Sequence, residues 1–459
     1  MNGRGSQTST AGGGESGDAS TESKAHPGGR HAPRRLRPGL VTLFPRRLEG
    51  APETWPLFRP TSLGRGREGR STEVRLKDGR VSRTHALIEP RSGGLFVRDL
   101  DSRHGSFVDG APVGSRGKVA GMGSVLRFGD TLLLAVDDVD RYQNAPRVIE
   151  AATLGLPKSV VAGPVLAEVW DQAARFANLD EPVLILGETG SGKECVARII
   201  HAHAPPARRG PFVALNVAAL PDALFEAELF GHVKGAFTGA TAARAGAFAE
   251  ASGGVLFLDE VGDLKAELQV KLLRALDLGR VRRLGASQDV AVSARVVSAT
   301  SRDLEACASE GRFRADLRYR LAALVIRVPP LRARRDDIVL LTMQVLGEAK
   351  PPLAVGADAT ELLLLAEWEG NARQLRHALV LAADQARAAG ADELRPEHLP
   401  ALQRPRHENE GLTEPAIRAA VMKAGGVTLR AAKLLGVSRT TLYKTMARLG
   451  MERKPPRSG

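Results

Sequence analysis

The central part of the chain alternates short apolar runs with stretches that have a helical pattern. The apolar runs lie at residues 182–186, 212–216, 253–260 and 295–300. Short apolar runs bounded by polar turns are typical of buried strands, and helical segments between them favour parallel pairing. The pattern therefore predicts an open α/β sheet, with a helical lid, within residues 159–400.

The N-terminal part has a different pattern of apolar residues. Residues 1–39 are rich in Gly, Ser, Thr and Arg. Burying so few apolar side chains cannot offset the conformational entropy lost on ordering. This segment is therefore predicted to be disordered. Short alternating runs follow, separated by turn residues, at 74–76, 86–88, 95–97 and 131–134. They predict an all-β sandwich over residues 40–138, followed by a linker at 139–158.

The last part of the chain predicts three helices. The first, at 414–424, places three apolar residues on one face: Ile417, Val421 and Met422. The second, at 429–435, follows Thr428 as its N-cap and ends at Gly436. The third begins after Ser438 and directs three apolar residues inward: Leu442, Met446 and Leu449. Two helices joined by a short turn form a helix-turn-helix, which we place at 413–455 after a linker at 401–412.

Composition narrows the class of protein. A chain of 459 residues has room for several domains, and its hydrophobic content of 43% suffices for their cores. The sequence has no apolar run long enough to span a membrane, and its N-terminus lacks the apolar core of a signal peptide. The two cysteines, Cys195 and Cys307, lie outside any metal-like cluster. We therefore expect a cytoplasmic protein.

The charge of the chain points to a polyanionic partner. The formal net charge is +13, and residues 413–459 contain ten Lys and Arg against two Glu. The second helix of the helix-turn-helix, which begins after Ser438, would enter the major groove of DNA. It would present four polar side chains to the DNA: Arg439, Thr440, Thr441 and Lys444. A basic helical hairpin that faces only solvent is the alternative.

The strand at 182–186 leads directly into a glycine-rich loop and a helix start. The loop comprises Gly187, Glu188, Thr189, Gly190, Ser191, Gly192, Lys193 and Glu194. Glycines let backbone N–H groups turn toward phosphates, the lysine reaches the outer phosphates, and the helix N-terminus adds positive charge. We therefore expect ATP here. Glu194 stands where the general pattern has the Ser or Thr that binds Mg²⁺, so the metal must find another ligand.

The apolar run at 253–260 ends in two carboxylates, Asp259 and Glu260. At a strand end beside a phosphate loop, Asp259 can hold Mg²⁺ and Glu260 can polarise the attacking water. A buried strand that ends in a solvated turn is the alternative. The spacing after the phosphate loop favours an enzyme that hydrolyses ATP.

A hexapeptide between the two motifs narrows the family. It comprises Gly235, Ala236, Phe237, Thr238, Gly239 and Ala240. Glycines at both ends predict a mobile loop, and exposing Phe237 at its tip is costly unless a partner binds it, although an ordinary turn with a half-buried Phe is the alternative. All six positions resemble the signature of the sigma-54-dependent bacterial enhancer-binding proteins, a branch of the AAA+ ATPases, and Glu194 also fits this family. The resemblance covers about residues 155–400.

This resemblance implies roles for further residues. The hexapeptide would contact sigma-54 in a movement driven by ATP hydrolysis. Asn216 would sense the nucleotide and restrain the catalytic Glu260. Arg314 and Arg320 match two arginine fingers that reach the γ-phosphate in a neighbouring subunit. An arginine that is only solvated, or paired with Asp316, is the alternative.

The resemblance also extends to the lid. Arg373 matches the second sensor and would contact the nucleotide. Two positions depart from the family pattern: Glu369 stands where proline is usual, and Ser301 stands where the first sensor is often Asn. Neither change removes a charge that the chemistry requires, so we expect altered rates and not an inactive enzyme.

The loops of the predicted sandwich resemble those of forkhead-associated domains, which bind phosphothreonine peptides. Four residues form the implied peptide site: Arg65, Ser82, Arg83 and His104. Arg65 and Ser82 would grip the phosphate, and His85 would brace the loops. The family usually has Asn at the position of His104, so weak binding is expected. A sandwich that regulates by packing alone is the alternative.

The helical tail resembles the Fis-type domains that end most enhancer-binding proteins. The whole chain therefore predicts a sigma-54-dependent activator that binds enhancer DNA, hydrolyses ATP with Mg²⁺ in a ring, expected to be a hexamer, and remodels sigma-54 RNA polymerase. A phosphothreonine protein or a kinase would act on the sandwich. Two alternatives are a DNA-binding regulator whose ATP site only controls oligomerisation and a phosphopeptide-binding scaffold with a vestigial motor.

Overall fold

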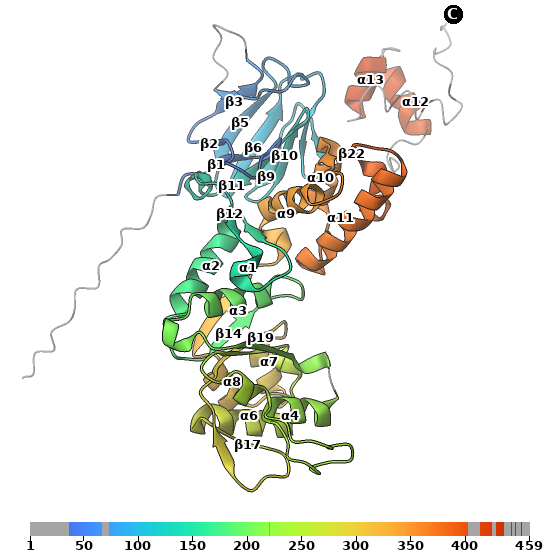
Figure 1. Ribbon diagram of the computed structural model, residues 1–459. Coiled ribbons are helices and arrows are strands. Elements are labelled where there is room, and N and C mark those ends of the chain that lie inside the picture. The colour runs from blue at the N-terminus through green and yellow to red at the C-terminus, as the bar shows by residue number, and fades with distance from the viewer. Residues whose placement is uncertain are drawn as a thin grey trace, which may run out of the picture. The chain divides into compact units, whose positions relative to one another are not determined.

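The computed structural model describes residues 36–66, 73–219, 221–402, 414–424 and 428–435, together with Leu442, Met446 and Met451 (Figure 1). All the elements described below belong to the unit formed by residues 37–459. Nearly all of the segment predicted to be disordered lies outside the described residues. The same holds for most of the linker predicted at 401–412.

The first domain is a sandwich of two sheets. One sheet has the strand order β2-β1-β11-β10-β7-β8, and the other has the order β4-β3-β5-β6-β9. Their strands are β1 (Gly39–Phe44), β2 (Thr54–Pro56), β3 (Thr61–Gly64), β4 (Val74–Arg75), β5 (Ala86–Arg91), β6 (Gly94–Asp99), β7 (Ser106–Val108), β8 (Ala111–Val113), β9 (Lys118–Gly121), β10 (Val125–Phe128) and β11 (Thr131–Val136). Alternate side chains of both sheets fill one apolar core. The predicted all-β sandwich is confirmed.

Residues 139–158 connect the sandwich to the next domain and form short elements of their own. These are the 3₁₀-helix η1 (Val139–Tyr142), strand β12 (Arg147–Ile149) and helix α1 (Ala151–Leu154). Strand β12 pairs with β13 (Val160–Ala162) in a two-stranded antiparallel sheet. The connection is therefore folded onto its neighbours.

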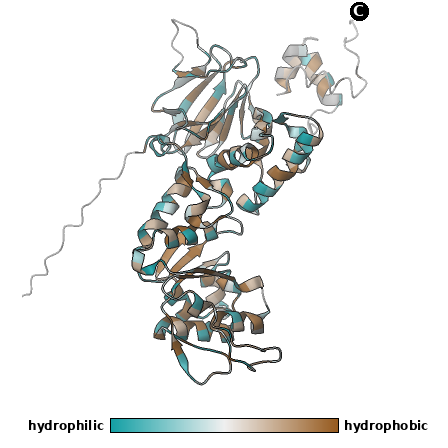
Figure 2. Ribbon diagram, in the orientation of Figure 1, coloured by the Kyte–Doolittle hydropathy of each residue, from teal (hydrophilic) through white to brown (hydrophobic). Residues whose placement is uncertain are grey.

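The second domain contains a five-stranded parallel sheet with the order β15-β16-β19-β14-β20. Its strands are β14 (Val183–Leu186), β15 (Phe212–Asn216), β16 (Val255–Asp259), β19 (Arg295–Thr300) and β20 (Leu324–Arg327). The first four coincide with the four predicted apolar runs, which confirms the open α/β sheet. These strands are mostly brown in Figure 2, as expected for strands buried on both faces.

Helices cover both faces of this sheet. They are α2 (Pro164–Phe176), α3 (Lys193–Ala202), α4 (Asp222–Phe230), α5 (Ala247–Glu250), α6 (Ala266–Leu278), α7 (Leu304–Ser309) and α8 (Ala315–Leu321), and a hairpin adds β17 (Arg280–Arg282) and β18 (Asp289–Ala291). Neighbouring residues of β16 belong to different cores: Leu256 packs with α4–α8, whereas Phe257 packs with α2 and α3. This alternation follows from the two-residue period of a strand.

The lid consists of three helices and one short strand pair. They are α9 (Arg335–Gly347), α10 (Ala357–Leu365), α11 (Asn371–Ala388), β21 (Ala354–Val355) and β22 (Glu393–Leu394). The lid shares one hydrophobic core with β1, β10 and β11 of the sandwich. Among the described residues, no helix is both long enough and apolar enough to cross a membrane.

Ion pairs surround the core that the sandwich and the lid share. The guanidinium of Arg127, on β10, donates to Glu361 at 2.6 Å and to Asp358 at 2.5 Å, both on α10. Arg335, at the start of α9, donates to Asp109 of the sandwich at 2.8 Å. The Arg127 side chain is largely buried, so these charges pack against both domains. A change in the sandwich therefore has a direct physical route to the lid.

The C-terminal part forms α12 (Glu414–Lys423) and α13 (Thr428–Leu434), as predicted for the first two helices. Ile417, Leu442 and Met446 share a small core. The prediction for Met422 was wrong, because its side chain is 80% exposed. Position 422 lies five residues after Ile417 and so points to another side of a helix with 3.6 residues per turn. The predicted DNA-contacting residues, Arg439, Thr440, Thr441 and Lys444, lie outside the described residues.

Candidate functional site

The phosphate loop connects β14 to α3 at the carboxyl edge of the sheet. Gly190 and Gly192 have φ angles of +73° and +108°, a region that L side chains rarely adopt. A Cβ at Gly190 would also overlap the carbonyl oxygen of Gly370 in the lid. The glycines are thus required both for the shape of the loop and for its close contact with the lid.

Lys193 and Ser191 fit a phosphate ligand. The Lys193 side chain is only 6% exposed, and its Nζ donates to the carbonyl oxygen of Gly187 at 3.0 Å and to Glu260 at 3.1 Å. The Ser191 hydroxyl is buried without a hydrogen-bond partner among the described residues. A buried hydroxyl and ammonium beside the N-terminus of α3 are suited to an anion. This donor set supports the predicted nucleotide site.

Glu260 lies at the end of β16 with its backbone at φ +54°. Its Oε2 accepts from both the backbone N–H and the hydroxyl of Ser301, at 2.9 and 3.0 Å. Burial alone would raise the pKa of Glu260, but the bonds from Ser301 and the charge of Lys193 hold that pKa below its usual value. Glu260 is therefore ionised at neutral pH, as a carboxylate that polarises water must be.

Asp259 differs from Glu260 in its electrostatics. Burial, and next the charge of Glu260, raise the pKa of Asp259 above its usual value. A bound cation would offset both effects. Mg²⁺ in nucleotide sites is held by one or two carboxylates together with phosphates and water. In the part of the chain that is described, no group of three or more acidic, His or Cys side chains could hold a metal alone. Asp259 thus fits a metal that is shared with phosphates.

The resemblance implies that Asn216 restrains Glu260, but in this structure the side chain of Asn216 lies beside Asp259. Its Nδ2 lies 3.4 Å from Asp259 Oδ2, a long hydrogen bond, and its Oδ1 accepts from the backbone N–H of Ala218. The contacts that hold Glu260 come from Ser301 and Lys193. Sequence reasoning noted Ser301 only as a departure and missed this contact, since the pairing of strand ends β16 and β19 brings the two residues together.

Glu194 takes no part in this cluster. Its side chain pairs with Arg198, one turn further along α3, at 2.9 Å. Whether Glu194 contacts the nucleotide or its metal stays a prediction.

The two arginine-finger candidates are half-exposed and paired within this chain. Arg314 donates to Asp316 at 2.7 Å, which is the pairing considered as its alternative. Arg320 lies 3.2 Å from Asp277 and donates to the carbonyl oxygen of Leu276. Exposed pairs of this kind contribute little to the stability of a fold, so either guanidinium could exchange its partner for a phosphate.

The lid contacts the phosphate loop at the start of α11. The backbone N–H of Ala372 donates to the carbonyl oxygen of Gly190 at 3.1 Å. Arg373 is the next residue, and its Cβ lies 3.1 Å from where a Cβ on Gly190 would stand. The sensor candidate is therefore placed beside the phosphate loop, with an exposed side chain.

The hexapeptide forms a tight turn. The backbone N–H of Gly235 donates to Ala240, and that of Ala240 donates to Phe237, at 2.9 and 3.0 Å. Phe237 is 37% exposed and packs its ring edge against His232, with the ring centroids 5.1 Å apart. Thr238 is exposed. The Phe at the tip is thus half-covered, and the hydroxyl beside it is accessible to a partner.

The predicted phosphopeptide residues meet at one end of the sandwich. Ser82 Oγ accepts from the backbone N–H of Arg103 at 3.0 Å, and Ser82 O accepts from that of Arg65. His85 is buried, and its Nδ1 accepts from Ser82 N while its Nε2 lies 3.1 Å from Gly105 O. Burial lowers the pKa of His85, which favours the neutral ring that these two contacts need.

His85 therefore ties two loops together, as its expected bracing role requires. The loops at this end of the sandwich also carry three exposed side chains: Arg65, Arg83 and His104. The candidate phosphopeptide site also includes the backbone N–H of Arg103, which the sequence did not indicate. It was missed because a backbone N–H leaves no signal in residue type.

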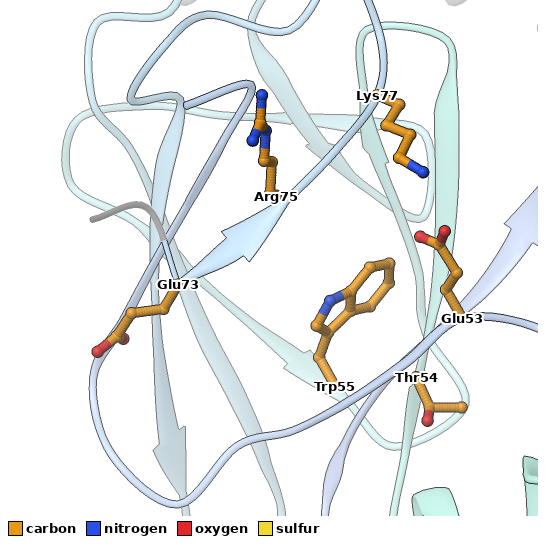
Figure 3. A pocket seen from close by; sticks show the side chains of 6 residues that line it. All are labelled: Glu53, Thr54, Trp55, Glu73, Arg75 and Lys77. Atoms are coloured by element: carbon orange, nitrogen blue, oxygen red, sulfur yellow. The ribbon is translucent and has the colours of Figure 1, made fainter. Parts of the chain in front are cut away.

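A separate hollow of about 790 Å³ lies beside β2 and β4 of the sandwich (Figure 3). Its lining mixes both signs of charge around one aromatic ring: Glu53, Thr54, Trp55, Glu73, Arg75 and Lys77. None of the four predicted phosphopeptide residues lines it. Figure 3 shows the Trp55 ring with Glu53 and Glu73 on either side and Arg75 and Lys77 above it, so the hollow is not a uniformly basic anion site.

Family models match four segments of the chain. They are the FHA domain at 61–129, the Sigma-54 interaction domain at 160–327, the AAA+ ATPase lid domain at 332–415 and the Fis family of bacterial regulatory proteins at 414–449. With the phosphate loop, the carboxylate pair and the lid contact, these matches define the class as AAA+ nucleotide-binding proteins.

Relatives narrow the class to one family. The chain is 40% identical to the transcriptional regulatory protein GlrR of Escherichia coli K12 over 309 residues, 66% of this chain and 68% of GlrR. It is 43% identical to the Nif-specific regulatory protein of Azotobacter vinelandii over 290 residues, 60% of this chain and only 55% of that protein. A solved structure of NtrX from Brucella abortus with ATP is 34% identical, covering 62% of this chain and 68% of that one, with a TM-score of 0.48. The chain belongs to the sigma-54-dependent enhancer-binding transcriptional regulators.

Proposed function

We propose that this protein activates transcription from sigma-54 promoters by coupling ATP hydrolysis to movement of the loop at 235–240. The observation that carries the proposal is the exposed Thr238 at the tip of a tight turn, on the same domain as a complete phosphate loop and carboxylate pair. Open-complex formation with purified sigma-54 polymerase and ATP tests it. The proposed setting is the cytoplasm, with enhancer DNA bound by residues 413–455.

The proposed chemistry assigns each charged group one task. Lys193 and the N-terminus of α3 bind the outer phosphates, and Glu260 accepts the proton of the attacking water. Mg²⁺, held by Asp259, would neutralise charge on the phosphates. Ser301 keeps Glu260 ionised and oriented through two hydrogen bonds. Arg373 approaches the nucleotide from the lid.

The proposed assembly is a homo-oligomeric ring, with a hexamer as the expected form. Arg314 is the N-cap of α8 and Arg320 lies on α8, and both side chains are half-exposed and so open to contact by a second subunit. A finger from the next subunit would stabilise the charge that spreads over the transferred phosphoryl group.

Mixing two inactive variants should restore part of the ATPase activity if Arg320 acts across subunits. In random rings of Arg320→Ala and Glu260→Gln protein, about one quarter of the interfaces would hold both native residues. Steady-state phosphate release measures the recovery. The matched control mixes Lys193→Ala with Glu260→Gln, whose defects lie in one site, and should show none. Failure to recover in rings shown to be mixed would contradict action in trans.

The sandwich is proposed to regulate the motor by binding a phosphothreonine peptide of a protein partner or kinase. The ion pairs of Arg127 and Arg335 and the shared core support the lid as the route. His104 in place of the usual Asn makes weak binding the expectation.

Arg65→Ala should abolish phosphate-dependent peptide binding by the full chain, because the hydroxyl of Ser82 alone cannot offset desolvation of a dianion. Arg91→Ala, an exposed change at the other end of β5, is the control and should bind normally. Titration with paired phosphorylated and unphosphorylated peptide libraries measures the difference. Equal binding of the two libraries would rule out a phosphopeptide sensor.

A further inference from the structure

Three side chains join the phosphate loop to the lid. The two terminal nitrogens of Arg332 donate to the two carboxylate oxygens of Glu188 at 2.8 and 2.6 Å. The amide of Asn371 donates to the same carboxylate at 3.1 Å. Glu188 belongs to the phosphate loop, whereas Arg332 precedes α9 and Asn371 begins α11. We call these three residues the clasp.

Asn371 combines a backbone conformation and a set of side-chain hydrogen bonds that few other residues could provide. It is fully buried, and its φ of +52° is one that few residues other than Gly, Asn and Asp adopt. Its Oδ1 accepts from the backbone N–H of Leu331 at 2.7 Å, while its Nδ2 also donates to the carbonyl oxygen of Thr189 at 3.0 Å. One amide thus fixes both the start of the lid and the phosphate loop.

The position of Asn371 has a direct effect on the nucleotide site. The next residue, Ala372, donates to Gly190 O, and the residue after it is Arg373. If the amide of Asn371 released the loop, the start of α11 would lose its alignment with Gly190. The clasp therefore lies directly beside the contact that places Arg373 next to the phosphate loop.

The Arg332–Glu188 pair is open to solvent, with side chains that are 57% and 40% exposed. The bond from Arg332, and next that from Asn371, lower the pKa of Glu188, so its carboxylate is ionised at neutral pH. An exposed pair adds little to the stability of a fold. Its effect lies in fixing the orientation of the Glu188 carboxylate toward Asn371.

We propose that Glu188, Arg332 and Asn371 are positioning residues that latch the lid onto the phosphate loop and set Arg373 for nucleotide binding. None of the three needs to touch the nucleotide. The proposal rests on the proposed nucleotide site, but it concerns the alignment of lid and loop and not hydrolysis.

Exchanging the amide and the carboxylate tests the clasp. Asn371→Asp keeps the shape and tolerates the positive φ, but it sets a second carboxylate against Glu188. We expect the affinity for a fluorescent ATP analogue to fall about tenfold or more, as when a charged hydrogen bond is lost. Adding Glu188→Gln to Asn371→Asp lets an amide face a carboxylate again, so part of the lost affinity should return, although the donation to the carbonyl oxygen of Thr189 stays absent.

Arg332→Ala should weaken binding by about two- to threefold, as suits an exposed pair. Arg395→Ala is the matched control, since Arg395 and Glu393 form a lid pair of similar exposure, 56% and 38%, away from the phosphate loop. This control should leave the affinity unchanged. Thermal melting without nucleotide should be similar for Arg332→Ala and Arg395→Ala.

The rescue is the decisive outcome. If the double variant binds no better than Asn371→Asp, the clasp does not position the site. If Asn371→Asp fails to fold, Asn371→Gly, which keeps the positive φ and removes the amide, replaces it, and an unchanged affinity in that variant would overturn the proposal. Binding is measured without turnover, so a protein that binds but does not hydrolyse ATP would contradict the proposed function and leave the clasp intact.

Discussion

Glu260→Gln is expected to bind ATP with nearly normal affinity and to hydrolyse it at least about a hundredfold more slowly, since a general base typically contributes a factor of this size. The amide has the volume of the carboxylate and can still accept from Ser301, so the site should keep its shape. It cannot take a proton from water. Rapid-quench measurement of a single turnover, together with nucleotide titration, separates the two effects.

Lys193→Ala is the complementary change and should lose nucleotide binding itself. Lys193 is buried among oxygen atoms, including those of Gly187 and Glu260, and it is the main side-chain charge available to the outer phosphates. Its loss would also leave Glu260 without its nearest cation.

Normal hydrolysis by Glu260→Gln would show that another group is the base.

Thr238→Ala is expected to abolish open-complex formation while ATP hydrolysis stays within about a factor of two of the native rate, because exposed substitutions rarely change stability by more than ~0.5 kcal/mol. Thr238 is exposed at the tip of the turn closed by Gly235 and Ala240. Its exposed hydroxyl is the proposed contact with sigma-54.

Thr241→Ala provides the matched control for this variant. Thr241 is also exposed and lies just outside the hexapeptide. It should support normal open-complex formation. Equal failure of both variants would indicate that the loop region is merely misfolded.

The sheet and the sandwich were predictable because their signals are local. The runs at 182–186 and 295–300 are apolar and short, and a strand needs little else to be recognised. Motif spacing likewise placed Lys193 and Glu260 at one edge, since strands of a parallel sheet end together. Met422 was wrongly predicted because a residue five positions after Ile417 lies on another side of a helix with 3.6 residues per turn.

The contacts between separate elements could not be read from the sequence. Ser301 meets Glu260 only because β19 lies beside β16 and Glu260 adopts a positive φ. Asn371 and Glu188 lie 183 residues apart and meet through the fold of the lid. Neither pairing leaves a periodic pattern, so residue type alone suggested other roles.

We propose that ATP hydrolysis at Glu260 drives the Thr238 loop against sigma-54. The most direct measurement is open-complex formation by sigma-54 RNA polymerase on promoter DNA, followed by footprinting with purified native, Glu260→Gln and Thr238→Ala proteins. We expect the native protein to open the promoter only with ATP, neither variant to open it, and Thr238→Ala to retain rapid phosphate release. Opening by the Thr238→Ala protein at the native level, or opening by the native protein without ATP, would rule out this coupling.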